Sequence, residues 1–214
     1  MDAAIAIADA EGADAVSMRR IAQVLRAGAM SLYWHVASKD QLLGLMLDTL
    51  IVEVQVPEPS GDWQADLRAQ ARSTRTVLLR HRWVMDFYGS RSSVGPNALR
   101  VIEASLAALD VLRIDTATAM NVLQTVNTYV SGAVLRELQE LQVQREQEQL
   151  GLSRQDFEAD LAAWRQKLAA TGQFEHFLRV LSDDVDPDAE QTRNARFEFG
   201  LDCLLDGIAA RIAS

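Results

Sequence analysis

Two short helical patterns separated by three residues place the strongest constraint on the fold of this chain. Ser17 is followed by apolar residues at helical spacing as far as Leu25, and a second pattern runs from Ala29 to His35. Gly28 lies in the break between them. Two helices of this length joined by so short a turn have the scale of a helix-turn-helix.

The flanking sequence predicts further helices and no sheet. A first helix covers residues 2–11 and ends at Gly12, and a fourth begins with the capping box Ser38-Lys-Asp-Gln41 and runs to about Gln55. Four prolines and eleven glycines in 214 residues leave room for long helices. We expect these over residues 62–81, 96–112, 115–148, 153–170 and 191–213. The predicted fold class is all-α.

The clearest change of composition is the linker "VPEPSGD". It predicts a helix-turn-helix DNA-binding domain over residues 1–55 and a larger all-helical domain over residues 56–214. The single Cys203 excludes an internal disulfide, no apolar run is long enough for a bilayer, and the N-terminus lacks the basic start of a signal peptide. We therefore expect a cytoplasmic protein without a membrane partner.

Charge is segregated in this acidic chain. The formal net charge is −9, yet residues 17–39 contain four basic residues and no Asp or Glu. On charge alone, a solvated face and a polyanion-binding surface are equally good interpretations. The residue types favour DNA: Ser17 at a helix start can hold a phosphate, and Arg19 can bind guanine or a phosphate. Ser31, Tyr33 and His35 crowd the second helix, which enters the major groove in this motif, and Lys39 can reach the backbone.

The strings "SMRRIAQVL" and "MSLYWHVASKDQLL" resemble the DNA-binding domain of the TetR family, and "LYWHV" is similar to its tetracycline-repressor branch. The tail "RFEFGLDCLLDGIAARI" resembles the last helix of the same branch. The resemblance implies a homodimer with a helical ligand-binding core that leaves operator DNA when a small effector binds. The DNA contacts that it implies are Ser17, Arg19, Ala29, Met30, Ser31, Tyr33, His35 and Lys39.

Three features depart from the family pattern. Ala29 and Met30 stand where some members have polar residues, so apolar contact with thymine methyl groups is expected there. Arg26 stands where the branch usually has Gly, which alters the turn or adds a phosphate contact. The chain also begins inside the first helix, so the family's basic arm either lies upstream or is absent. Trp34 is expected in the domain interior, because Tyr33 beside it is assigned to DNA.

Apolar stripes on the long helix and on the last helix suit a dimer seam built from two copies of each. The alternative is packing within one chain. The residues predicted at the seam are Val126, Val130, Val134, Leu138, Leu201, Leu204 and Ile208.

A ligand pocket is predicted from an aromatic cluster and a polar stripe. The alternatives are that the aromatic cluster belongs to the core and that the polar stripe is a solvent face. The candidate ligand-binding residues are His81, Trp83, Phe87, Tyr88, Asn121, Gln124 and Thr128. The three histidines and Cys203 lie far apart in sequence, so we expect no metal and no cofactor.

The leading hypothesis is a transcriptional repressor with an unknown small-molecule effector and two operator half-sites about 34–36 Å apart. An enzyme is not expected, because the chain lacks a Gly-rich phosphate loop, a nucleophile elbow and an HExxH pattern. The alternative is a helical ligand-binding or adaptor protein with a vestigial helix-turn-helix. The sequence names neither the effector nor the operator, and it leaves activator and repressor open.

Overall fold

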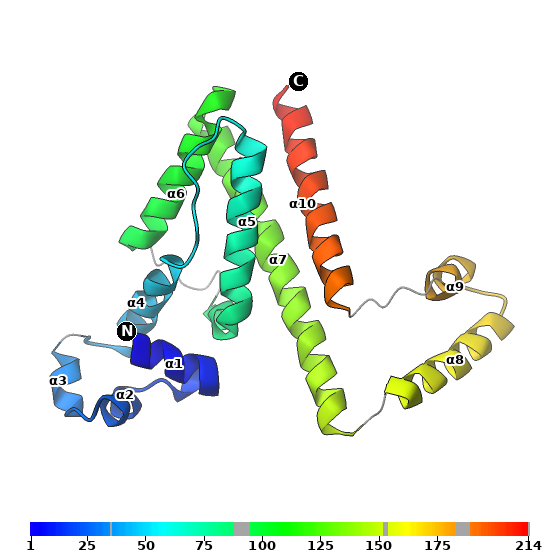
Figure 1. The fold of residues 1–214 in the computed structure, drawn as a ribbon, viewed down its shortest axis with the longest axis horizontal. Coiled ribbons are helices and arrows are strands. Elements are labelled where there is room, and N and C mark those ends of the chain that lie inside the picture. Colours follow the sequence, from blue (N-terminus) through cyan, green and yellow to red (C-terminus); the bar gives the residue numbers. More distant parts are fainter. Residues whose placement is uncertain (35, 88–94, 152–153, 183–188, 214) are drawn as a thin grey trace. The chain divides into compact units, whose positions relative to one another are not determined.

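The computed structural model describes residues 1–34, 36–87, 95–151, 154–182 and 189–213, and every regular element in those ranges is a helix (Figure 1). The α-helices are α1 (Asp2–Glu11), α2 (Met18–Leu25), α3 (Ala29–Tyr33), α4 (Lys39–Ile51), α5 (Trp63–Arg80), α6 (Pro96–Leu109), α7 (Thr116–Gln149), α8 (Arg154–Ala170), α9 (Glu175–Ser182) and α10 (Glu190–Ile212). Short 3-10 helices are η1 (Ala13–Ala15), η2 (Arg82–Phe87) and η3 (Asp110–Leu112). The all-α prediction is confirmed, and α9 was not predicted from the sequence. None of the helices in the described ranges is both long and apolar enough to cross a bilayer.

The chain divides into two compact units. One comprises Met1–Leu135 with Leu201–Ser214, and the other is Arg136–Gly200. The first unit contains α1 to α6, the part of α7 that precedes Arg136, and the C-terminal half of α10. The predicted domain boundary near residue 56 stays a prediction, because this division does not fall there.

Side-chain caps fix where the N-terminal helices begin. The Ser17 hydroxyl accepts a hydrogen bond from the Arg20 amide at 3.2 Å, and the Ser38 hydroxyl accepts one from the Gln41 amide at 3.1 Å. The Gln41 side chain in turn accepts from the Ala37 amide at 2.8 Å, one residue before the position in a standard capping box. The caps therefore define both ends of the segment that holds α2 and α3.

The turn between α2 and α3 begins at Arg26, which adopts a left-handed conformation with φ 52° and ψ 39°. An L-residue in this region costs about 1–2 kcal/mol relative to the right-handed helix, and Gly avoids that cost. Arg26 thus makes the turn at the position where the resemblance leads us to expect Gly. Its side chain is exposed.

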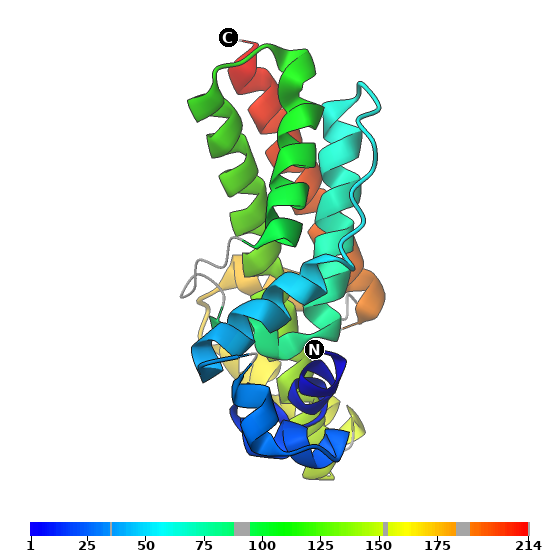
Figure 2. The same ribbon diagram turned by 90° about the vertical axis from the view of Figure 1, so that its left-hand side faces the viewer.

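Helix α4 joins the N-terminal helices to the rest of the first unit. Figure 2 shows it between α1–α3 and the ends of α5 and α6. Its residues Leu43, Met46 and Leu50 are buried. A stripe of apolar residues on each face lets one helix pack on both sides.

Helices α5, α6 and α7 and the C-terminal half of α10 form the other part of this unit (Figure 1). Arg68 of α5 donates to Asp202 of α10 through Nε at 3.0 Å and through a terminal nitrogen at 2.8 Å. Asp115 caps α7 by accepting from the Thr118 amide and hydroxyl, and these two bonds hold the pKa of Asp115 below its ordinary value.

Several residues predicted at a dimer seam belong to the chain's own core. Val126, Val130, Val134 and Leu201 are all buried within the single chain. These four side chains pack within the single chain, and their place at a dimer seam stays a prediction. Helical periodicity alone does not distinguish packing within a chain from packing between chains. The other three predicted residues, Leu138, Leu204 and Ile208, are half-buried.

The second unit has its own polar and aromatic contacts. Glu140 of α7 accepts from Arg136 at 2.9 Å and from Arg196 of α10 at 2.6 Å. Trp164 of α8 and Phe177 of α9 pack edge to face with ring centres 6.1 Å apart. These contacts join α7 to α10 and α8 to α9.

Candidate DNA-binding surface and ligand pocket

Helix α3 presents large side chains to solvent. Met30 is 75% exposed, Tyr33 is 52% exposed and Trp34 at the helix end is 87% exposed. Exposed apolar and aromatic side chains that are gathered on so short a segment mark an interaction site rather than ordinary surface. On the inner side, Leu32 is half-buried and Val36 is buried, and these two residues anchor the segment.

The expected place of Trp34 in the interior is wrong. Successive residues of a helix point about 100° apart, and α3 is so short that Leu32 and Val36 suffice to cover its inner side. Trp34 and Tyr33 therefore both lie outside. Sequence reasoning missed Trp34 as a surface residue, although its place beside Tyr33 in a polar, cationic window was a usable signal.

Basic groups flank this aromatic surface. Arg19 and Arg26 are exposed, whereas Arg20 pairs with Glu11 at 2.6 Å. The ammonium group of Lys39, at the start of α4, lies 3.5 Å from the Asp14 carbonyl oxygen. Such a weak contact in solvent is easily exchanged for a phosphate.

The two predicted serines already take part in local hydrogen bonds. Ser17 accepts from an amide, so its hydroxyl hydrogen remains available to a phosphate oxygen. Ser31 donates to the Gly28 carbonyl at 2.6 Å and retains acceptor capacity. Ala29 is the first residue of α3, and His35 lies outside the described residues. The other predicted DNA contacts thus come from α3 and from the first turns of α2 and α4.

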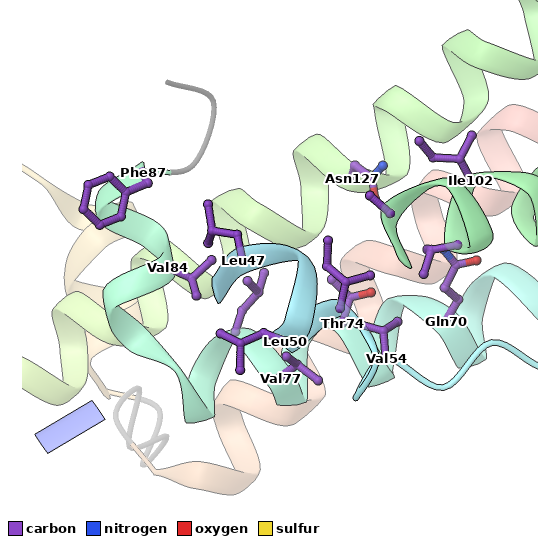
Figure 3. A pocket seen from close by; sticks show the side chains of 14 residues that line it. Leu47, Leu50, Val54, Gln70, Thr74, Val77, Val84, Phe87, Ile102 and Asn127 are labelled. Carbon is purple, nitrogen blue, oxygen red and sulfur yellow. The ribbon is translucent and has the colours of Figure 1, made fainter. Parts of the chain in front are cut away.

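A cavity of about 330 Å³ lies within the first unit, in the size range of small-molecule sites (Figure 3). Its walls come from α4, α5, η2 and α6, with Val54 from the segment after α4 and one residue from α7. The lining residues are Leu47, Leu50, Ile51, Val54, Gln70, Thr74, Val77, Leu78, Val84, Phe87, Ala98, Val101, Ile102 and Asn127.

The predicted pocket residues are only partly brought together here. Phe87 lines the cavity, and Tyr88 lies outside the described residues. Helix α7 contributes Asn127 to the lining, whereas the predicted polar stripe is exposed on the surface of that helix. That stripe consists of Asn121, Gln124 and Thr128.

His81 and Trp83 are buried in a different cluster. Nδ1 of His81 lies 2.8 Å from Oδ1 of Asp9. Nε1 of Trp83 donates a hydrogen bond to the same oxygen at 2.9 Å. Nε2 of His81 lies 3.4 Å from Glu53, which also accepts from Arg80 at 2.7 Å. This cluster fastens α1 and the segment after α4 to the end of α5. Its geometry indicates a structural role.

Asp48 connects α4 to α6 beside the cavity. Its buried carboxylate accepts from the Asn97 amide at 3.2 Å, from the Asn97 side chain at 3.0 Å and from the Ala98 amide at 3.1 Å. The carboxylate thus caps the N-terminus of a neighbouring helix. A side chain at Gly95 would overlap this carboxylate.

The pocket and Asp48 were missed by sequence reasoning. The string "LGLMLDTLI" in α4 has more apolar residues than one buried face needs, and it contains a single acid. That excess was the available signal for a second apolar surface, and the lone Asp48 was the signal for a buried polar partner. Neither signal identifies the opposing helices.

Comparisons with known proteins agree over the whole chain. Residues 1–46 match the profile of bacterial regulatory proteins of the tetR family, and residues 56–212 match the tetracyclin repressor-like C-terminal domain. The HTH-type transcriptional repressor DrrR1 of Streptomyces coeruleorubidus is 33% identical over 215 residues, covering 100% of this chain and 77% of that protein. Tetracycline repressor protein class A from transposon 1721 of Escherichia coli is 28% identical over 212 residues, covering 98% and 88%.

A solved structure with the same fold contains a small molecule. The TetR family protein ActR of Streptomyces coelicolor, in complex with actinorhodin, superposes with a TM-score of 0.74 at 30% identity, covering 99% of this chain and 95% of that one.

Proposed function

Because this chain belongs to the TetR family of bacterial transcriptional regulators, we propose that it is a repressor whose operator is released when a small molecule fills the pocket beside α4. Its relative DrrR1 is named as a repressor, and the similar ActR binds actinorhodin. In this proposal, the exposed residues of α3 read the major groove, and the flanking cations hold phosphates.

The observation that carries the proposal is the double role of α4. Lys39 in its first turn belongs to the proposed DNA-binding surface. Leu47, Leu50 and Ile51, two to three turns later, line the cavity. A rigid helix with one end at the DNA and the other in the pocket wall transmits a change at either site.

The mechanism is a shift between two populations of the regulator. A molecule in the pocket separates or rotates α4 against α6, and the recognition helices then no longer match the operator. The effector shifts the equilibrium only by as much as its affinities for the two conformations differ. Operator DNA must weaken effector binding by the same factor.

We also propose that the regulator acts as a homodimer, because one α3 per chain reads only one half-site. Leu204 and Ile208 of α10 are half-buried in the single chain and can be covered by a second copy. The proposed dimer then places two recognition helices about one turn of DNA apart, roughly 34–36 Å.

The test is fluorescence anisotropy of the full chain against DNA duplexes that tile the region beside its own gene, at two salt concentrations. We expect tight binding to one near-palindromic tile, weakened steeply by salt and lost in Tyr33→Ala. The matched control is Val111→Ala, which removes a comparably exposed side chain far from α3 in sequence.

Absence of binding to every tile, followed by failure of a random-sequence selection, would overturn the repressor function. The helix-turn-helix would then be vestigial, and the chain would be a helical ligand-binding or adaptor protein.

A further inference from the structure

The chemistry of the cavity wall restricts the ligand that fits it. Of the 14 lining residues, only Gln70, Thr74 and Asn127 are polar, and none carries a charge. Burying an unpaired charge in such a wall is strongly unfavourable, because no group there replaces the lost water. The lining therefore selects against charged molecules.

Asp48 and Arg100, whose neighbours in sequence line the cavity, are both already engaged in hydrogen bonds. The Asp48 carboxylate accepts hydrogen bonds from the first turn of α6. The guanidinium of Arg100 lies 3.4 Å from the carbonyl oxygens of Ile51 and Val54, at the end of α4. Neither residue lines the cavity, so neither offers a counter-charge to a ligand.

The polar groups gather at one end of the cavity. Figure 3 shows Gln70 and Asn127 near Ile102, with Thr74 next along the wall, whereas Leu47, Val84 and Phe87 lie at the opposite end. The Ser105 hydroxyl lies 2.7 Å from the amide oxygen of Gln70 and 2.6 Å from the Val101 carbonyl oxygen, and its one hydrogen is shared between these two acceptors. With its oxygen on this side, the Gln70 amide can donate to a ligand through its nitrogen. Hydrogen-bond donors are thus offered along one edge only.

We propose that the pocket binds an uncharged molecule with an apolar body and oxygen acceptors along one edge, the oxygens facing Gln70, Thr74 and Asn127. This inference rests on the proposed function, since it identifies the chemical class of the effector. It excludes organic anions, organic cations and metal chelates as effectors at this site.

A pair of fluorescent probes that differ by one anionic sulfonate group tests the apolar body. N-phenyl-1-naphthylamine is neutral, and 1-anilinonaphthalene-8-sulfonate has the same rings with one negative charge. We expect the neutral probe to bind the full chain with one site and at least about tenfold more tightly than the anion. Equal or tighter saturable binding of the anion at this site would overturn the proposal.

Variants on α6 locate the probe. Val101→Trp fills the cavity and is expected to reduce the affinity of the neutral probe about tenfold or more, whereas Leu99→Trp on the exposed side of the same helix leaves it unchanged. Thr74→Lys places a cation in the wall and is expected to reverse the preference in favour of the anion. If Val101→Trp does not fold, Thr74→Lys still tests whether the probes bind in this cavity. An unchanged preference in folded Thr74→Lys contradicts the assignment.

A neutral naphthalene probe that bears a ketone, 6-propionyl-2-dimethylaminonaphthalene, tests the polar edge. Gln70→Leu is expected to weaken this ketone probe several-fold while leaving the affinity of N-phenyl-1-naphthylamine unchanged. An equal loss of affinity for both probes in Gln70→Leu would contradict the proposal, because Gln70 would then recognise no oxygen acceptor of the ligand.

Anisotropy with operator DNA, measured without any probe, separates this inference from the function on which it rests. A chain that binds its operator and prefers the anionic probe retains the proposed function and loses the inferred ligand class. A chain that binds no DNA and holds the neutral probe in the cavity loses the function and retains the chemistry of the pocket.

Discussion

At the scale of single residues, Trp34 is the most informative side chain of the DNA-binding surface. It is 87% exposed, so its removal takes little from the core. We expect Trp34→Ala to change the free energy of unfolding by less than about 0.5 kcal/mol and to lower operator affinity at least about tenfold. Thermal unfolding and anisotropy on the same preparation check both parts. Val111→Ala, the exposed control, should change neither quantity. A normal operator affinity in Trp34→Ala would remove this residue from the interface.

Gly95 is a second residue with a specific requirement. A Cβ atom there would overlap the buried carboxylate of Asp48, whereas a Cβ at Gly132 in α7 meets open space. We therefore expect Gly95→Ala to lower the free energy of unfolding by about 1–3 kcal/mol. Gly132→Ala should raise it by up to about 1 kcal/mol, because Ala favours a helix more than Gly does. Urea denaturation of the two variants gives the comparison, and equal effects would contradict the close packing of Asp48 on α6.

The residues predicted from sequence succeeded where the signal was local. Ser17 and Ser38 were predicted at helix starts, and each accepts a hydrogen bond from the amide three residues later. The predicted interior position of Trp34 was wrong, because the direction of this side chain depends on which neighbours fill the inner side of α3. That information lies in the packing and not in the local pattern.

At the scale of elements, Glu140 joins α7 to α10 in the second unit. Partial burial pushes the pKa of Glu140 upward, but the hydrogen bonds and charges of Arg136 and Arg196 outweigh burial and hold the pKa below its ordinary value of 4.5. A carboxyl whose pKa is depressed by folding stabilises the protein above its unfolded pKa. This contribution is lost as the pH falls through the lower folded pKa.

We expect Glu140→Gln to lower the free energy of unfolding by roughly 1 kcal/mol at pH 7. The difference from the unmodified chain should shrink as the pH falls below about 4.5, because the carboxyl of the unmodified chain then becomes neutral too. Urea denaturation from pH 7 to pH 3 measures this convergence. Glu103→Gln, on an exposed part of α6, is the control. A difference that is constant with pH would show that the charge of Glu140 is not what joins these helices.

The helices themselves were largely predictable, since caps and apolar spacing are local, but their partners were not. The stripe Val126, Val130 and Val134 has the same period whether it faces another helix of the chain or a second chain. Its burial in the single chain shows that it packs against other parts of the same chain. The cavity was equally inaccessible to sequence reasoning, because its 14 lining residues come from five separate helices and the segment after α4.

At the scale of the whole molecule, release of the operator requires coupling between the pocket and the DNA-binding surface. Leu47 in the cavity wall precedes Asp48, and Ala98, which donates to Asp48, also lines the cavity. A ligand therefore contacts both sides of the hydrogen-bonded connection between α4 and α6. Through α4 this connection reaches Lys39 and the surface around α3.

The most direct test of this coupling is a fluorescence titration of N-phenyl-1-naphthylamine into the free chain and into the chain saturated with its operator duplex. We predict weaker binding of the probe to the operator complex, and a loss of operator affinity by the same factor when the probe is saturating. A duplex of scrambled sequence serves as the control. Equal affinity of the probe for the free chain and for the operator complex would contradict the account, because a pocket that is not linked to DNA binding cannot release an operator.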